Sequence, residues 1–303
     1  MTEQNTTHNE HSCIATDKYG RELTEHGSAI FPIACYETDL AGEYIPWHWH
    51  DDFEFMIVES GTATVLTDSE KHTVTAGNGF IINCGTLHSI VGDGSNGGLF
   101  RSVVFHPRLL GSTDSIFWQK YLRAFTENKS FSGFMLDRRI GWQKDAAKSI
   151  AEVYSALKNA NEGYEFVIRE QLSHIIFNTW RQLPALGESS SIKPLRRADR
   201  TKTMLSFIHS NFAEDISIRD IATAAMVSES ECLRCFHSTI NTTPIQYLIE
   251  YRIHRAADML TQSSEKISAV ALKCGFQDFS YFTRCFRKIK GCTPKEFRLK
   301  ARC

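Results

Sequence analysis

The chain has 303 residues, a formal net charge of −1 and 42% hydrophobic residues, a composition that is ordinary for a globular protein of two domains. It contains no run of 18 or more apolar residues, and residues 1–13 lack the apolar segment of a secretory signal, so we expect no transmembrane helix and no secretion. The sequence therefore predicts a cytoplasmic protein without a membrane partner. Residues 1–27 are expected to form a flexible tail.

Residues 28–112 have the pattern of a β-rich domain. Thr and aliphatic residues mix in residues 62–67, and an apolar run at residues 80–82 follows the Gly-rich turn at residues 77–79. Short β-rich runs separated by turns are typical of an antiparallel barrel or jelly roll. We therefore expect a β-barrel or jelly roll here.

Four residues within this region have the spacing of a metal site. His48 and His50 would lie on one side of a strand, and Glu54, four residues further on, would lie on the same side. His88, from another strand, would complete a cluster of three imidazoles and one carboxylate. Such a cluster suits Fe, Mn, Ni or Zn. The same side chains could instead line a pocket for an organic effector or satisfy one another.

The segments around these residues resemble the two cupin motifs. The first segment, residues 42–61, matches the family pattern in full. The second, residues 77–92, departs from it, with Asn83 in place of the usual Pro and Gly92 in place of the closing Asn. The resemblance implies a cupin-like effector-binding barrel over residues 28–112, with His48, His50, Glu54 and His88 in its effector pocket or metal site.

Residues 113–184 have helical periodicity. Three apolar stripes recur at helical spacing, and they predict helices that either close the barrel or form a dimer interface. The stripes are Phe117, Tyr121, Leu122 and Phe125; Ile150, Val153, Tyr154 and Leu157; and Phe166, Ile168, Leu172, Ile175, Ile176 and Phe177. The polar residues that follow predict a flexible linker at residues 185–199.

A repeat with an offset of 50 residues dominates residues 200–303. Arg-Cys-Phe followed by Thr-Pro occurs at residues 234–244 and again at residues 284–294. In each copy, a short helix, a turn and a second helix are expected, and Thr243 and Thr293 each begin a further helix through a capping box. Such units predict an all-α double helix-turn-helix domain. Cys232 and Cys235 are interpreted as core residues, because no second ligand pair accompanies them.

Charge separates this domain from the remainder of the chain. Residues 195–303 contain 18 basic and 11 acidic residues, against 16 basic and 24 acidic residues elsewhere. A basic domain joined to an acidic one indicates that one half of the chain meets phosphate.

Residues 200–300 resemble the AraC/XylS transcriptional regulators, most specifically at residues 274–288 and 291–297. The resemblance implies that two recognition helices enter adjacent major grooves. Two residues depart from the family pattern. Met226 replaces the usual Gly, so we expect that turn to avoid a positive φ, and Leu233 is apolar where a polar base contact is common. The implied DNA-binding residues are Ser230, Leu233, Arg234, Phe279, Ser280, Thr283, Arg284 and Arg287.

The whole chain is thus interpreted as a one-component transcription regulator rather than an enzyme. We expect it to bind promoter DNA and a small-molecule effector, with a sugar implied by the resemblance alone. Homodimerisation through residues 113–184 is also implied by the resemblance, as is contact with RNA polymerase if the protein activates transcription. One alternative is a metal-dependent cupin enzyme fused to a DNA-binding module. Another is a monomeric DNA binder whose N-terminal domain is only a partner platform.

Overall fold

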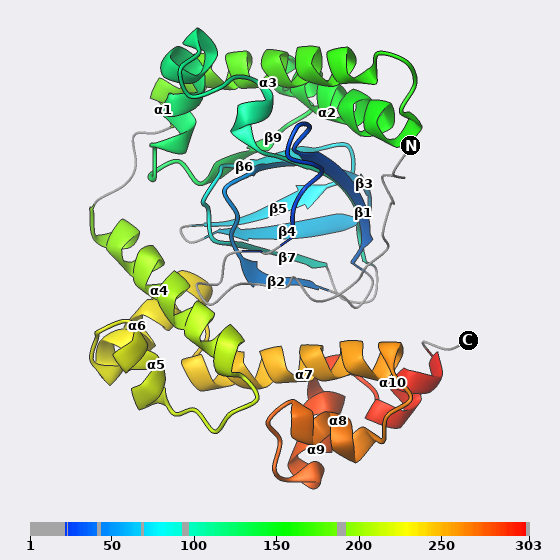
Figure 1. The fold of residues 1–303 in the computed structure, drawn as a ribbon, viewed down its shortest axis with the longest axis vertical. Coiled ribbons are helices and arrows are strands. Elements are labelled where there is room, and N and C mark those ends of the chain that lie inside the picture. Colours follow the sequence, from blue (N-terminus) through cyan, green and yellow to red (C-terminus); the bar gives the residue numbers. More distant parts are fainter. Residues whose placement is uncertain are drawn as a thin grey trace. The chain divides into compact units, whose positions relative to one another are not determined.

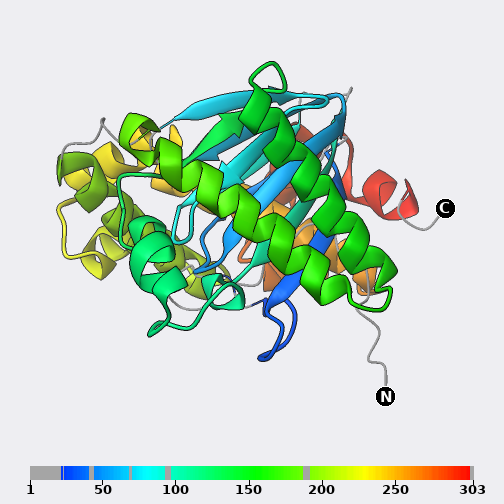
Figure 2. The same ribbon diagram turned by 90° about the horizontal axis from the view of Figure 1, so that it is seen from above.

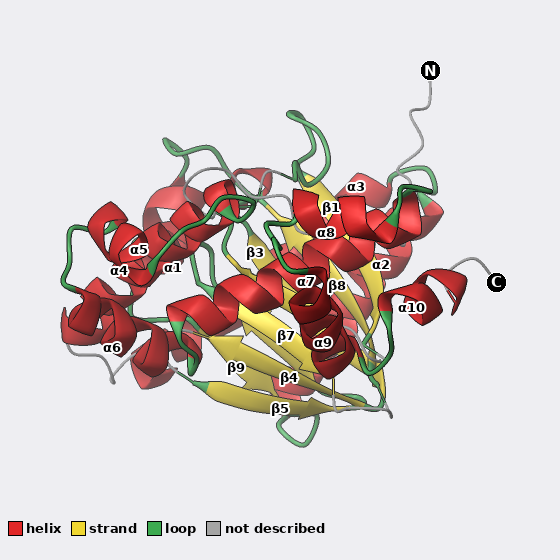
Figure 3. Ribbon diagram, turned by 90° about the horizontal axis from the view of Figure 1, so that it is seen from below, coloured by secondary structure: helices red, strands yellow, loops and turns green. Residues whose placement is uncertain are grey.

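The computed structural model describes residues 22, 24–40, 44–67, 70–92, 97–186 and 192–300. Most of the expected N-terminal tail lies outside these residues. The chain forms two compact units, and the boundary between them falls between Leu195 and Arg196, within the expected linker. All the described strands belong to the first unit, and the second is helical (Figures 1 and 3).

The N-terminal unit contains two antiparallel sheets. One has five strands in the order β1-β8-β3-β6-β9, and the other has four in the order β2-β7-β4-β5. The described strands therefore form a two-sheet jelly roll, one of the two architectures expected from the sequence, and no ladder joins the two sheets. The strands are β1 (Ile33–Asp39), β2 (Tyr44–His48), β3 (Phe53–Ser60), β4 (Thr62–Thr67), β5 (Lys71–Thr75), β6 (Gly79–Ile82), β7 (His88–Gly92), β8 (Leu99–Phe105) and β9 (Gly133–Leu136).

The five-stranded sheet is buried on both faces. Successive side chains of a strand point to opposite faces, so β3 contributes Met56 and Val58 to the core between the sheets and Phe53 and Phe55 to the core beneath the helices. This double burial explains why residues 53–58 are all buried instead of alternating with exposed positions. Glu54 shares the inner face with Met56.

Helices α2 (Gly141–Asn159) and α3 (Tyr164–Leu186) cover the outer face of the five-stranded sheet (Figures 1 and 2). The second and third apolar stripes supply most of this contact, but Phe166 and Phe177 stay exposed. In the first stripe, Tyr121 and Leu122 lie in a π-helical turn, Trp118–Leu122, and Phe125 lies in the short helix α1 (Arg123–Thr126), while Phe117 directly precedes the turn.

Strand β9 corrects the expectation that residues 113–184 are helical throughout. It pairs with β6, and Phe134 and Leu136 alternate with half-buried neighbours, which is strand periodicity. The linker is also shorter than expected. Helix α3 extends to Leu186 and helix α4 begins at Ile192, leaving only residues 187–191, which lie outside the described residues.

The second unit contains the two expected helix-turn-helix units. Ser228, Thr243 and Asp278 accept hydrogen bonds from backbone amides at the starts of α6, α7 and α9, and Thr293 does the same before α10. The helices are α4 (Ile192–Asn211), α5 (Ile218–Ala224), α6 (Glu229–Ile240), α7 (Pro244–Gln262), α8 (Ile267–Lys273), α9 (Phe279–Lys290) and α10 (Pro294–Lys300).

The turn of the first helix-turn-helix unit contradicts the expectation for Met226. Its φ is +53°, and the equivalent Gly275 of the second unit has a φ of +80°. Both turns have the same hydrogen bonds, from residue 227 to the carbonyl of residue 222 and from residue 276 to that of residue 271, each at 3.0 Å. The turn geometry therefore imposes a left-handed residue, whichever side chain is present.

Among the described residues, no helix combines the length and the apolar character that crossing a bilayer requires.

Candidate metal centre and nucleic-acid interface

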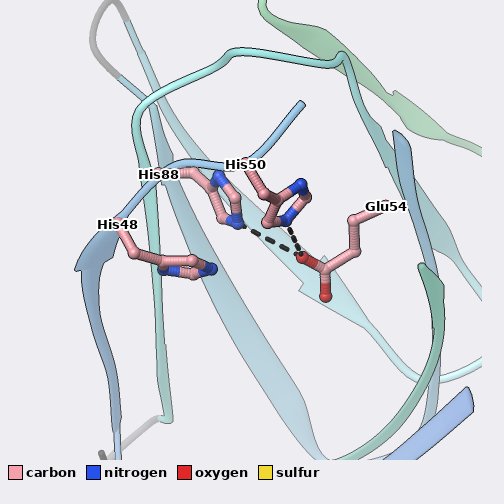
Figure 4. A group of neighbouring side chains, drawn as sticks. All are labelled: His48, His50, Glu54 and His88. Atoms are coloured by element: carbon pink, nitrogen blue, oxygen red, sulfur yellow. Dashed lines mark hydrogen bonds and ion pairs between the residues drawn. The ribbon is translucent and has the colours of Figure 1, made fainter. Parts of the chain in front are cut away.

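The jelly roll brings together the four residues expected to form a site. His48, His50, Glu54 and His88 are all buried, and one potential ligand atom from each lies within 4.8 Å of the others (Figure 4). His48 and His88 are direct partners in the register of β2 and β7, while Glu54 comes from β3 of the other sheet. His50 follows β2 rather than belonging to it, so its position comes from the turn before β3 and not from strand alternation.

All three imidazoles of this cluster, here called the His₃Glu cluster, are fixed through Nδ1. The Nδ1 atoms of His48, His50 and His88 lie 2.9 Å from the carbonyl oxygens of Pro46, Asp52 and Thr86. Because a carbonyl oxygen only accepts hydrogen bonds, each Nδ1 carries a proton. These hydrogen bonds orient the rings so that Nε2 of His50 and of His88 faces Glu54. Backbone carbonyls hold metal-ligating histidines in the same way.

Glu54 provides the negative charge of the cluster. Its Oε2 lies 3.2 Å from Nε2 of His88 and 3.6 Å from Nε2 of His50. Burial by itself would raise the pKa of the Glu54 carboxyl, but hydrogen bonds and charge from these two imidazoles bring that pKa well below its usual range. The cluster therefore presents an ionised carboxylate that needs a cation beside it, either a protonated imidazole or a metal ion.

The β6–β7 loop makes hydrogen bonds to the backbone around the His₃Glu cluster. Asn83 donates through Nδ2 to the carbonyls of Phe125 and Phe131 at 3.0 and 2.8 Å, and Gly85 donates its N–H to the carbonyl of His50 at 2.7 Å. Asn83 thus has a structural function, holding the turn after α1. In the sequence it was visible only as a departure from the cupin motif.

His26 is a neighbour of the cluster that the sequence did not indicate. Its ring meets that of His50 edge to face at 5.5 Å, and its Nδ1 lies 2.8 Å from the hydroxyl of Tyr36. No spacing rule connects a residue before β1 with the His-x-His motif, so only the fold brings them together.

The DNA-binding positions implied by the resemblance lie on the outer faces of α6 and α9. Ser230, Leu233 and Arg234 are exposed on α6, while Cys232, Cys235 and Phe236 are buried on its other face. On α9 all the implied positions are exposed except Thr283, which is half-buried; they are Phe279, Ser280, Thr283, Arg284 and Arg287. The second helix of each unit therefore presents the Arg of its Arg-Cys-Phe motif on an exposed face, while the Cys and Phe of the motif pack on the opposite face.

The two matched arginines have different neighbours. Arg234 donates through Nη1 to Oε2 of Glu231 at 2.7 Å, and the other oxygen of Glu231 accepts from Arg200 of α4 at 3.3 Å. Arg284 lies over the ring of Tyr281, 5.9 Å from its centroid. Tyr281 occupies in the second repeat the position of Glu231 in the first.

Profiles of known protein families match both the N-terminal and the C-terminal part of the chain. The profile of the AraC-like ligand binding domain matches residues 31–197, more than half of the chain, and that of a helix-turn-helix domain matches residues 221–300. The chain belongs to the AraC family of transcriptional regulators.

Its relatives cover most of its length. An uncharacterized HTH-type transcriptional regulator of Bacillus subtilis, YdeC, is 28% identical over 93% of this chain and 97% of its own. The transcriptional activator RhaR of Mannheimia succiniciproducens is 26% identical over 84% of this chain and 87% of its own. Among solved structures, ToxT of Vibrio cholerae is 13% identical over 91% of this chain and 99% of its own, with a TM-score of 0.49.

Proposed function

We propose that this AraC-family regulator is a one-component sensor that binds promoter DNA as a homodimer and responds to a small molecule bound in the jelly roll. The observation that carries the proposal is the matched pair of exposed faces on α6 and α9, in a chain that also contains an AraC-like ligand-binding domain. A regulator of this kind acts where the chromosome lies, in the cytoplasm. If it activates transcription, RNA polymerase is its further partner.

The test is the substitution Arg284→Ala in the full-length protein. Arg284 lies between Ser280 and Arg287 on one face of α9, where a base-contacting Arg contributes about 1–3 kcal/mol to binding of the correct sequence. Binding is measured on a duplex selected by the wild-type protein from a random library and on a duplex of shuffled sequence. We expect loss on the selected duplex alone.

Lys288→Ala is the matched control on the same helix. It is expected to weaken binding to both duplexes by a similar and smaller factor, because a surface Lys contacts phosphate without reading sequence. Equal losses on both duplexes for Arg284→Ala would contradict a base-reading role, and failure of the wild-type protein to select any duplex would contradict the proposed function.

We further propose that the His₃Glu cluster holds one divalent metal ion, of the class Fe, Mn, Ni or Zn. Support comes from the donor set, three imidazoles fixed through Nδ1 and one buried ionised carboxylate, which suits these ions. A bound ion would supply a Lewis-acidic centre to which hydroxyl or carboxylate groups of an effector can coordinate, and sugars are the first class to test.

Metal content and calorimetry of the purified full-length protein test this second proposal. We expect about one equivalent of metal, with affinity reduced by more than about 100-fold in His48→Ala and Glu54→Gln, because loss of an outer-shell partner alone costs about 10- to 100-fold. His72→Ala is the control, since His72 lies on β5 outside the cluster. A wild-type protein that binds none of these metals would favour a purely organic effector pocket.

The alternative of a metal-dependent enzyme shares this cluster. Turnover of a substrate by the metal-loaded protein, lost in Glu54→Gln, would favour that alternative over a sensor. Belonging to a family of transcriptional regulators supports the sensor.

A further inference from the structure

The ion pair between Glu231 and Arg234 lies on the face of α6 that is expected to meet DNA. The side chains of Arg234 and Glu231 are 59% and 21% exposed. An exposed pair of this kind contributes about 0–1 kcal/mol to folding, so protein stability gives little reason for it. A carboxylate on a surface that approaches phosphates also opposes DNA binding.

Glu231 is nevertheless held in a definite place. Its backbone N–H is capped by Ser228 at 3.2 Å, and its two carboxylate oxygens divide between two guanidinium groups. Oε2 accepts from Arg234 of the same helix, and Oε1 accepts from Arg200 of α4. A third contact reaches Oε1 from the Sγ of Cys235 at 3.7 Å. The carboxylate therefore ties the side chain of Arg234 to the body of the first helix-turn-helix unit.

The second unit has no carboxylate at the position equivalent to Glu231. Tyr281, at the repeat position of Glu231, lies beneath Arg284, and the remaining basic residues of α9 are Arg287, Lys288 and Lys290. Helix α6 offers only Arg234 and His237 as basic groups, against two glutamates in its first turn. The two recognition helices thus differ in charge, although they share a fold.

We infer that Glu231 is a positioning residue that sets the sequence discrimination of the first helix-turn-helix unit. It pre-orients Arg234 for a base edge and restrains Arg234 and Arg200 from binding phosphates of arbitrary sequence. Orientation by a fixed partner lowers the conformational entropy lost when the guanidinium binds. The first unit then depends on this one oriented arginine for its selectivity, whereas the second unit adds the charge of Arg287, Lys288 and Lys290 to the base contact proposed for Arg284. This inference rests on the proposed function, because it assumes that α6 contacts DNA.

Glu231→Gln in the full-length protein tests the inference. Loss of the carboxylate should raise affinity for shuffled duplex and steepen the dependence of log K on log salt concentration by about 0.9 for each phosphate that a released guanidinium contacts. Affinity for the selected duplex should not rise in proportion, so we expect the ratio of selected to shuffled affinities to fall about 10-fold, as for one poorly oriented base contact.

Two further variants separate geometry from net charge. Glu229→Gln removes one negative charge from the same helical turn and should change both affinities by the same factor, leaving the ratio intact. Glu231→Asp keeps the charge on a shorter stem that cannot span both guanidinium groups, so it should lower the ratio as Glu231→Gln does. Thermal unfolding of each variant confirms that the fold is retained.

The decisive measurement is the double mutant. In an Arg234→Ala background, Glu231→Gln should leave the ratio of affinities unchanged, because the group that it positions is absent. If Glu231→Gln lowers the ratio equally with and without Arg234, or if Glu229→Gln lowers it as much, the inference is wrong. A wild-type protein that selects a duplex but shows an unchanged ratio in Glu231→Gln contradicts the inference alone, whereas one that selects no duplex contradicts the proposed function and, with it, the inference.

Discussion

At the scale of single residues, the turns of the two helix-turn-helix units differ in the residue at their left-handed position, which is Met226 in the first and Gly275 in the second. Gly275 adopts its left-handed conformation without a Cβ, and a Cβ there would lie 2.7 Å from the carbonyl oxygen of Phe212. Met226 adopts the same conformation with a full side chain that is 93% exposed. A left-handed residue other than Gly carries a strain of about 1–2 kcal/mol, so the first turn stores strain that the second avoids.

Replacing Met226 by Gly is therefore expected to stabilise the protein. Removal of the strain outweighs the greater chain entropy of Gly in the unfolded state, about 0.4–1 kcal/mol, so the free energy of unfolding should rise by about 0.5–1 kcal/mol. Urea unfolding measures the change. Gly275→Ala is the opposite substitution and should destabilise by more than this, because it adds a backbone clash to the strain. A Met226→Gly variant less stable than wild type would show that the exposed side chain contributes packing that the strain argument omits.

At the scale of elements, α4 and α7 bury two histidines in the core of the second unit. His209 of α4 stacks on Tyr251 of α7, with ring centroids 4.3 Å apart, and its Nε2 lies 2.7 Å from the hydroxyl of Tyr247. Burial, helped by the charge of Arg255, lowers the pKa of His209 to about 3. Burial also lowers the pKa of His254 on α7 well below its usual range.

These helices should therefore lose stability in acid. Both histidines are neutral in the folded protein, while an unfolded His takes up a proton below a pKa of about 6.5. The unfolded state binds more protons, so the free energy of unfolding is unaffected by these groups above about pH 6.5 and falls by about 1.4 kcal/mol per pH unit and per His below it, until the folded pKa is reached.

The substitution His209→Gln measures how much His209 contributes to the dependence of the free energy of unfolding on pH. Urea unfolding followed by circular dichroism between about pH 7.5 and pH 5 should show a slope smaller by one proton than in wild type. Comparing slopes, rather than absolute stabilities, cancels the constant cost of changing the hydrogen bond to Tyr247. An unchanged slope would mean that His209 becomes charged in the folded protein.

At the scale of the whole molecule, α3 has an apolar face that the N-terminal unit does not bury. Phe166 and Phe177 are 82% and 45% exposed, and Val167 is 41% exposed. Phe166 and Phe177 are separated by 11 residues, which is close to three helical turns and places them on one side of the helix. Exposed aromatic side chains on one helix face are typical of an interface between proteins.

The homodimer proposed above should therefore depend on this face. Phe166→Asp combined with Phe177→Asp should convert the full-length protein from dimer to monomer in analytical ultracentrifugation, because an interface cannot accommodate two unpaired carboxylates. Ile140→Asp is the control, since Ile140 is 45% exposed but lies outside α3. A wild-type protein that sediments as a monomer would instead support the partner-platform alternative.

Patterns among residues close together in the sequence predicted the helix-turn-helix units and the grouping of the cluster residues. The 50-residue repeat, the capping residues Ser228, Thr243 and Thr293, and the spacing of His48, His50 and Glu54 were sufficient to predict the helix-turn-helix units and to group the cluster. Helix caps succeed because they depend on residues only a few positions apart. The three cluster residues stay together because His50 lies in the short turn between β2 and β3, and His48 and Glu54 lie on the two strands beside that turn.

Tertiary structure alone decided the remainder. Strand β9 forms because residues 133–136 meet the free edge of β6, and the periodicity of so short a segment cannot reveal its partner. Met226 takes a positive φ because the packing of α5 against α6 fixes the turn, overriding its own preference. The same holds for His26 against His50 and for Arg200 against Glu231, since these contacts join residues 24 and 31 positions apart, beyond the range of any helical or strand period.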